Sequence, residues 1–132
     1  MAITEKRGRP VSVLIASASA HEVSLVASTL DTCIVSESPA ILIGDKAYDS
    51  DPLDASLRER GINMVAPHKR NRKRPATQDG RRLRRYKRRF KVERFFSWLE
   101  DFRRLVVRWE YHALNYLGFL HLACIRILIK YL

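Results

Sequence analysis

The spacing of apolar residues predicts three short elements at the start of the chain. Residues 11–16 (VSVLIA) are apolar and β-branched, which is typical of a strand. Residues 1–4 are also apolar, and the turn-forming EKRGRP between the two segments predicts a hairpin. Residues 21–30 carry Val23, Val26, Ala27 and Leu30 at helical spacing, so we expect a short helix packed on a sheet.

The next segments predict a parallel pair of strands joined by a helix. Residues 41–44 (ILIG) form a continuous apolar run, which is typical of a strand buried on both faces. Asp51 is expected to cap a helix with Pro52 at its first position, and Gly61 is expected to end that helix. Residues 62–66 (INMVA) predict another strand, so the order of elements indicates an α/β fold.

The second half of the chain has a different pattern. Residues 67–80 contain two prolines and predict a basic loop. A long helix is expected over residues 81–109. Its apolar stripe consists of Val92, Phe95, Phe96, Leu99, Phe102 and Val106. Residues 114–132 are apolar on most faces but interrupted by His121 and Arg126, so we expect a buried or interface helix, too short and interrupted for a membrane span.

Charge is concentrated in one segment. The chain has 25 Lys and Arg against 14 Asp and Glu, a net charge of +11. Residues 67–94 hold 14 basic and 2 acidic side chains, so they carry the whole excess. Such a field attracts polyanions and favours nucleic acid as the partner, although a solvated basic surface without a partner is the alternative. The side chains expected to contact DNA are Lys69, Arg70, Arg72, Lys73, Arg74, Arg81, Arg82, Arg84, Arg85, Lys87 and Arg88.

Length and cysteine content restrict the class of protein. The 132 residues match one domain, and 46% hydrophobic residues argue against disorder. Cys33 and Cys124 lie far apart and provide neither a disulfide framework nor a zinc-ligand spacing. We therefore expect a cytoplasmic protein with no membrane association.

Asp45 is the first candidate for chemistry. It follows the buried run ILIG, and functional groups in open α/β sheets gather at the carboxyl ends of strands. The alternative is an Asx-turn that leads the chain out of the strand.

A second candidate group lies on the expected long helix. Tyr86, Arg89 and Glu93 are three and four residues apart, which places them on one helical face. Glu93 fits either an ion pair with Arg89 or Arg94, or a metal ligand that the surrounding bases keep ionised. Tyr86 fits a core aromatic residue equally well.

Three segments together resemble the DDE transposases of bacterial insertion sequences: LIGDKAYDSDPL, YKRRFKVERFFSWL and FRRLVVRWE. In that family a Tyr, an Arg three residues later and a Glu four residues further mark the catalytic helix, and Tyr86, Arg89 and Glu93 match this spacing. The resemblance covers roughly residues 1–130. It implies that Asp45 is the second catalytic acid, that Glu93 is the third, and that Tyr86 and Arg89 support the site or contact DNA.

The resemblance also implies a ribonuclease H-like fold and a two-metal mechanism, with carboxylates that hold Mg²⁺ or Mn²⁺. The family's first acid lies on a central strand, and we expect none of the acids before Asp45 to lie in mid-strand. Residues 1–132 are therefore expected to form a single partial domain that lacks this strand, is inactive alone, and leaves the hairpin unpaired with residues 41–44. Glu100 also departs from the family, because many relatives carry a basic or amide side chain there.

The partners follow from the same resemblance. Double-stranded DNA at transposon ends is the expected substrate, and a second copy or an upstream transposase segment is the expected protein partner. One alternative is a catalytically dead remnant that still binds DNA or full-length transposase. Another is a basic RNA-binding or ribosome-associated protein, which would need neither Asp45 nor Glu93. A catalytic role requires these two acids to converge, with Cα atoms on the order of 10 Å apart.

Overall fold

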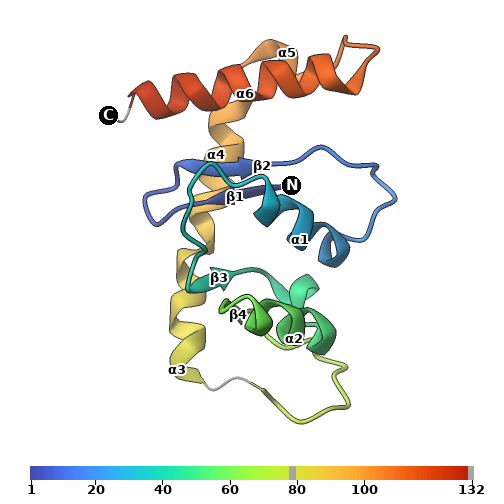
Figure 1. Ribbon diagram of the computed structural model, residues 1–132, viewed down its shortest axis with the longest axis vertical. Helices are drawn as coiled ribbons and strands as arrows, with labels where there is room; N and C mark the ends of the chain where they lie inside the picture. The colour runs from blue at the N-terminus through green and yellow to red at the C-terminus, as the bar shows by residue number, and fades with distance from the viewer. Residues whose placement is uncertain (78–79, 131–132) are drawn as a thin grey trace.

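The computed structural model describes residues 1–77 and 80–130, apart from the side chains of Arg82, Arg88 and Arg89. Short strands and helices alternate through the first half of the chain, and helices make up the second half. In Figure 1 two small sheets lie one above the other. The segment from α3 to α4 runs along both sheets, and the last helix crosses the end of the molecule.

The first sheet is the predicted hairpin. Strands β1 (Ala2–Thr4) and β2 (Pro10–Val13) pair antiparallel, with Ile3 opposite Ser12. Gly8 in the connecting turn has a φ of 87°, a backbone conformation that favours glycine. The strand ends at Val13, earlier than predicted. Beyond Leu14, whose N–H donates to the Met1 carbonyl, it has no further strand partner among the described residues.

The second sheet is the predicted parallel pair. Strands β3 (Ile41–Ile43) and β4 (Asn63–Val65) pair parallel, with Leu42 opposite Met64, and α2 (Asp51–Glu59) connects them. The β3 side chains are half-buried, so the prediction of burial on both faces is wrong. The reason is that all three β3 residues line a cavity.

The predicted cap of α2 is shifted by one residue. Ser50 is the N-cap, and its hydroxyl accepts a hydrogen bond from the Leu53 N–H at 3.5 Å. Asp51 lies in the first turn, where its carboxylate instead binds Arg72 and Arg74. Gly61 follows the helix with a φ of 74°, as expected for a glycine that ends a helix.

The predicted helix over residues 81–109 is wrong as a single element. The segment divides into α3 (Gly80–Leu83), a 3₁₀ helix η2 (Arg84–Arg89), α4 (Phe90–Glu100) and α5 (Arg103–Val106). Five of the six η2 residues are basic, and like charges one turn apart destabilise an α-helix. After Glu100 the chain turns through extended Phe102, which joins the core while Val106 stays exposed.

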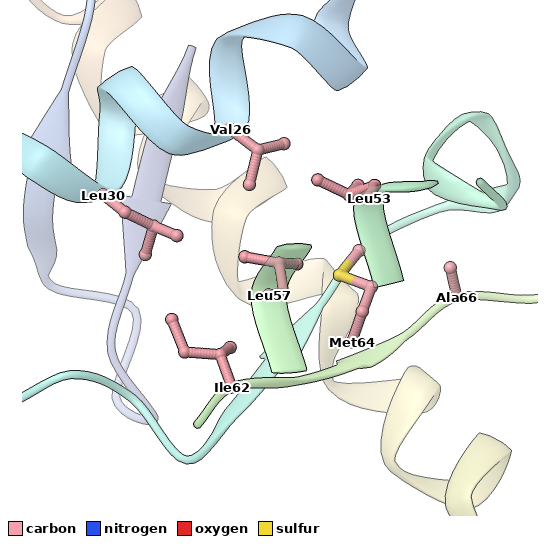
Figure 2. Close-up of a cluster of buried hydrophobic side chains, with 7 residues drawn as sticks. All are labelled: Val26, Leu30, Leu53, Leu57, Ile62, Met64 and Ala66. Carbon is pink, nitrogen blue, oxygen red and sulfur yellow. The ribbon is translucent and has the colours of Figure 1, made fainter. Parts of the chain in front are cut away.

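Two separate cores hold the elements together. The first joins side chains from α1 (Glu22–Asp31), α2 and the β4 segment, which point toward one another in Figure 2. Its buried members are Val26, Leu30, Leu53, Leu57, Ile62, Met64 and Ala66. The second joins β2, α4 and α6 (Ala113–Lys130) around fully buried Phe95. The first core also packs against Ile3 of β1, so it supports both sheets, whereas the second core supports the hairpin.

The two sheets are not joined by a ladder among the described residues. Helix α1 contacts both hairpin strands, while η2 contacts β3 and α4 contacts β1. Helices therefore hold the sheets in place relative to each other, in agreement with the expected absence of a regular ladder between the hairpin and β3.

Helix α6 contributes buried side chains to the second core and also has an exposed apolar face. Leu120, Cys124 and Ile127 are buried, whereas Leu122 and Ile129 are exposed. By length and composition α6 is apolar enough to cross a membrane, so the prediction that it is too short and interrupted is corrected. One such helix is weak evidence for a membrane span.

Candidate active site

Asp45 lies at the carboxyl end of β3 and is fixed there by a local turn. Its Oδ1 accepts a hydrogen bond from the Ala47 N–H at 2.7 Å, which caps the short 3₁₀ helix η1 (Lys46–Tyr48). The Asx-turn considered from the sequence is therefore present. The turn holds the half-buried carboxylate beside the strand end, where a functional group of an α/β sheet is expected.

Glu93 lies in the first turn of α4, and its side chain is exposed. It lines the same cavity as Asp45, with a volume of about 1470 Å³. The walls of this cavity come from β1, β3, α1 and α4. The two acids predicted to converge thus share one cavity, and the distance between their Cα atoms stays a prediction.

Strands β1 and β3 both line the cavity. Asn63 N–H donates to the Ala40 carbonyl and Gly44 N–H donates to the Val65 carbonyl, both at 3.0 Å. Because alternate residues of a parallel strand bond to one side, the peptide groups of Ile41 and Ile43 face away from β4. Both isoleucines also line the cavity, so the free edge of β3 borders it.

Two further residues at this cavity were missed from the sequence. Burial, followed by the nearby carboxylates Glu22 and Asp45, raises the pKa of Tyr48 to about 12. Tyr48 therefore remains a neutral phenol at physiological pH. Tyr48 could have been predicted near the site, because it follows Asp45 by only three residues. No local sequence pattern at the start of α1 indicates that Glu22 lines the same cavity.

Tyr86 and Arg89 lie in η2 rather than in a continuous α-helix with Glu93. Residues three apart still share a face in a 3₁₀ helix, so their mutual spacing remains compatible with one site. Tyr86 is half-buried, while the side chain of Arg89 lies outside the described part of the chain.

The basic residues proposed from the sequence fall into two groups. Arg72 is 12% exposed and binds Asp49 and Asp51, so it faces inward. The side chains of Arg82 and Arg88 lie outside the described part of the chain. The exposed group consists of Lys69, Arg70, Lys73, Arg74, Arg81, Arg84, Arg85 and Lys87. Arg85 also lines the Asp45 cavity, so the lining of this cavity includes a basic side chain.

The donors at the cavity suit a hard cation. Asp45 and Glu93 offer carboxylate oxygens, the ligand type that Mg²⁺ and Mn²⁺ prefer. Within residues 1–77 and 80–130 no group of three or more His, Cys, Asp or Glu side chains is arranged to hold a metal ion. Asp45 and Glu93 therefore offer the ligand type of a hard cation, two carboxylates that line the same cavity.

Comparison with known proteins gives a consistent family. Residues 1–128 match the transposase DDE domain. A Burkholderia cepacia protein named as a transposase for insertion sequence element IS402 is 30% identical over 130 residues, which cover 92% of this chain and 58% of that protein. A Brucella ovis protein named as a transposase for element IS6501 is 36% identical over 91 residues, which cover 67% of each chain.

No solved structure matches the chain significantly. The family match nevertheless spans nearly every residue, and it includes both cavity acids and the basic segment between them. The IS402 relative is similar along almost all of this chain, although the chain spans little more than half of that relative. On this similarity, the chain belongs to the transposase DDE domain family.

Proposed function

We propose that this chain acts in DNA transposition, as the part of a DDE transposase that binds DNA and supplies two catalytic carboxylates. Asp45 is the second acid of the site and Glu93 is the third, with Tyr86 and Arg89 in support. The observation that carries the proposal is that Asp45 and Glu93, far apart in sequence, line one cavity in a chain of this family.

The free strand edges support a ribonuclease H-like sheet that is incomplete in residues 1–132. The peptide groups of Ile41 and Ile43 point away from β4, and β1 lines the same cavity as β3. A central strand between β1 and β3 would pair both edges and bring the first catalytic acid beside Asp45. Its source is an upstream transposase segment or a second copy of the protein.

Divalent metal fits the two acids. When bound, Mg²⁺ or Mn²⁺ supplies Lewis acidity at a phosphodiester and lowers the pKa of an attacking hydroxyl. The residues of this chain hold the metal through Asp45 and Glu93, and Arg85 supplies positive charge at the cavity. The exposed basic side chains of residues 69–87 bind the backbone of double-stranded DNA at the transposon ends. This activity places the protein in the cytoplasm with the DNA.

Metal binding tests the assignment of the acids. We expect Mn²⁺, followed by electron paramagnetic resonance, to bind the purified chain, and Asp45→Asn or Glu93→Gln to weaken that binding at least tenfold. Glu59→Gln is the matched control, because Glu59 is an exposed carboxylate on α2 that does not line the cavity. Equal Mn²⁺ affinity in all four proteins would overturn the assignment.

Strand cleavage tests the incomplete site. The chain alone should not nick supercoiled DNA with Mg²⁺ or Mn²⁺, because two carboxylates do not hold both metals of the family mechanism. Robust nicking that Asp45→Ala abolishes would place the first acid within residues 1–132.

One observation favours a second candidate, a catalytically dead remnant that binds DNA or intact transposase. The described residues contain no group of three metal-binding side chains. Addition of the full-length IS402-type relative distinguishes the two candidates. A contributing chain restores cleavage to a relative that lacks its own second acid, whereas a dead remnant only inhibits the relative.

A further inference from the structure

A cluster of charged side chains folds the basic loop back onto the start of α2. Arg72 Nη1 donates to Asp49 Oδ1 at 2.7 Å, and Arg72 Nη2 donates to Asp51 Oδ1 at 2.6 Å. We refer to Asp49, Asp51, His68 and Arg72 as the loop clamp. Its acids follow η1, and its bases belong to the loop after β4, so the clamp joins two segments that are distant in sequence.

Asp49 is the centre of the loop clamp. Its side chain is only 5% exposed, and its Oδ2 accepts a hydrogen bond from the Lys69 N–H at 2.8 Å. His68 Nδ1 lies 2.8 Å from Asp49 Oδ1, and His68 Nε2 accepts from the Thr77 N–H at 3.2 Å. Because Nε2 accepts, Nδ1 carries the proton and donates to Asp49. The carboxylate thus holds the beginning of the loop directly, and His68 connects it to Thr77 near the end of the loop.

The loop clamp leaves Arg72 little surface for a ligand. A guanidinium that binds two carboxylates through separate nitrogens is held in a fixed orientation. The Arg72 side chain is 12% exposed, whereas the side chains of Lys69, Arg70 and Lys73 are exposed. The arrangement separates an inner base that organises the loop from outer bases that are available to phosphates.

Asp49 also connects the loop to the proposed catalytic acid. Asp45 caps η1, and Asp49 ends it by donating its N–H to the Lys46 carbonyl at 3.3 Å. The loop is therefore attached directly to the turn that positions Asp45. A displacement of Asp49 would move the loop relative to that acid.

We propose that Asp49 and Arg72 are a positioning pair, which holds residues 67–77 in the conformation that presents Lys69, Arg70 and Lys73 to the DNA backbone. Arg72 itself contacts no phosphate. The part of this inference that concerns DNA rests on the proposed function, whereas the ordering of the loop does not.

The direction in which Asp49→Asn changes DNA affinity separates this positioning role from a simple charge effect. Removal of a carboxylate from a basic surface makes that surface more positive, so charge alone predicts tighter DNA binding by Asp49→Asn. The positioning role predicts weaker binding, by about tenfold if the free loop spends one tenth of its time in the binding conformation.

The salt dependence of binding tests which bases contact phosphates. Fluorescence anisotropy of a labelled duplex should show that Asp49→Asn, Arg72→Gln and Arg72→Lys each weaken binding with the slope of log K against log salt unchanged. Arg72→Lys is decisive, because lysine retains a phosphate contact but cannot bridge both aspartates. Lys73→Gln should instead reduce the slope by about 0.9.

The double variant and a matched control complete the binding test. Asp49→Asn combined with Arg72→Gln should lose no more affinity than either single variant, because both remove the same pair. Asp31→Asn is the control, since Asp31 is an exposed carboxylate that pairs with Arg60 at 2.6 Å outside the loop. The proposal is overturned if Asp49→Asn binds DNA as tightly as the unsubstituted chain, or if Arg72→Lys retains full affinity.

Trypsin cleavage measures the loop without DNA. The loop contains Lys69, Arg70 and Lys73 as exposed cleavage sites. Asp49→Asn and Arg72→Gln should be cut there several-fold faster than the unsubstituted chain and Asp31→Asn, with circular dichroism unchanged. Unchanged cleavage in both variants would overturn the loop clamp. Failure of the unsubstituted chain to bind DNA would instead overturn the proposed function, and the cleavage result would still decide the clamp.

Discussion

Gly44, which directly follows β3, lies against the side chain of Met64 on the paired strand β4. A Cβ atom on Gly44 would come within 2.5 Å of Met64 Cε and 2.7 Å of Tyr48 Cδ2. The Met64 methyl group can rotate away, but the Tyr48 ring belongs to η1, which Asp45 caps. The absence of a side chain at position 44 therefore lets η1 pack closely on the strand end.

Gly44→Ala should therefore destabilise the protein by about 1–3 kcal/mol, the usual cost of overpacking. Gly118→Ala is a control for which the change in unfolding free energy should have the opposite sign, because nothing lies within 4 Å of its Cβ position in α6. That substitution should stabilise the helix by about 0.5–1 kcal/mol. Urea unfolding followed by circular dichroism measures both changes, and the same sign for both would contradict the packing argument.

Phe95 should dominate the second core. It is fully buried between β2 and α6, so Phe95→Ala should cost about 3–5 kcal/mol of unfolding free energy. Phe96 has 46% of its surface exposed, and Phe96→Ala should cost less than about 1 kcal/mol. The difference between the two variants in urea denaturation tests which face of α4 is inside.

Tyr48 should ionise at an unusually high pH. Burial and the nearby carboxylates raise its pKa to about 12, so its phenolate should appear about two pH units above that of an ordinary tyrosine. Absorbance at the phenolate band, compared with that of Tyr48→Phe, identifies the transition. Because the unfolded chain loses this proton first, stability is full below about pH 10 and declines as the pH rises toward 12. A normal titration of Tyr48 would show that it is solvated.

The two thiols should react slowly with iodoacetamide in the folded protein. Burial raises the pKa of Cys124 to about 11, and burial also raises the pKa of Cys33, which is half-buried. Mass spectrometry at pH 8 should therefore show Cys124 modified more slowly than Cys33, with both modified rapidly in urea. Equal rates for Cys124 in the folded and unfolded protein would contradict its place in the core.

DNA binding should depend strongly on salt and little on sequence. Contact with about six phosphates gives a log–log salt slope near −5. Arg84 and Arg85 are exposed, so replacing both with alanine should reduce that slope by about two. Arg126→Ala is the control, because Arg126 is exposed on α6, outside the basic segment. An affinity that barely changes between low and moderate salt would contradict phosphate binding.

Local patterns in the sequence determined much of the first half of the fold. The hairpin, the parallel pair and the helix end at Gly61 depend on residues that are neighbours in the chain, and the structure contains all three. The family also followed from the sequence, because the segments around Asp45 and Glu93 lie within the matched residues.

The tertiary structure decided what those local patterns left open. Apolar spacing predicted one helix over residues 81–109, but it contains no information about the tertiary core that Phe102 joins after the chain turns. Charge counts made Arg72 equivalent to the other bases, although Asp49 and Asp51 turn it inward. Contacts between residues that are distant in sequence depend on how the helices and strands pack, and local sequence patterns do not contain that information. For that reason the fold, not the local sequence, gathers Asp45, Glu93 and Tyr48 at one cavity.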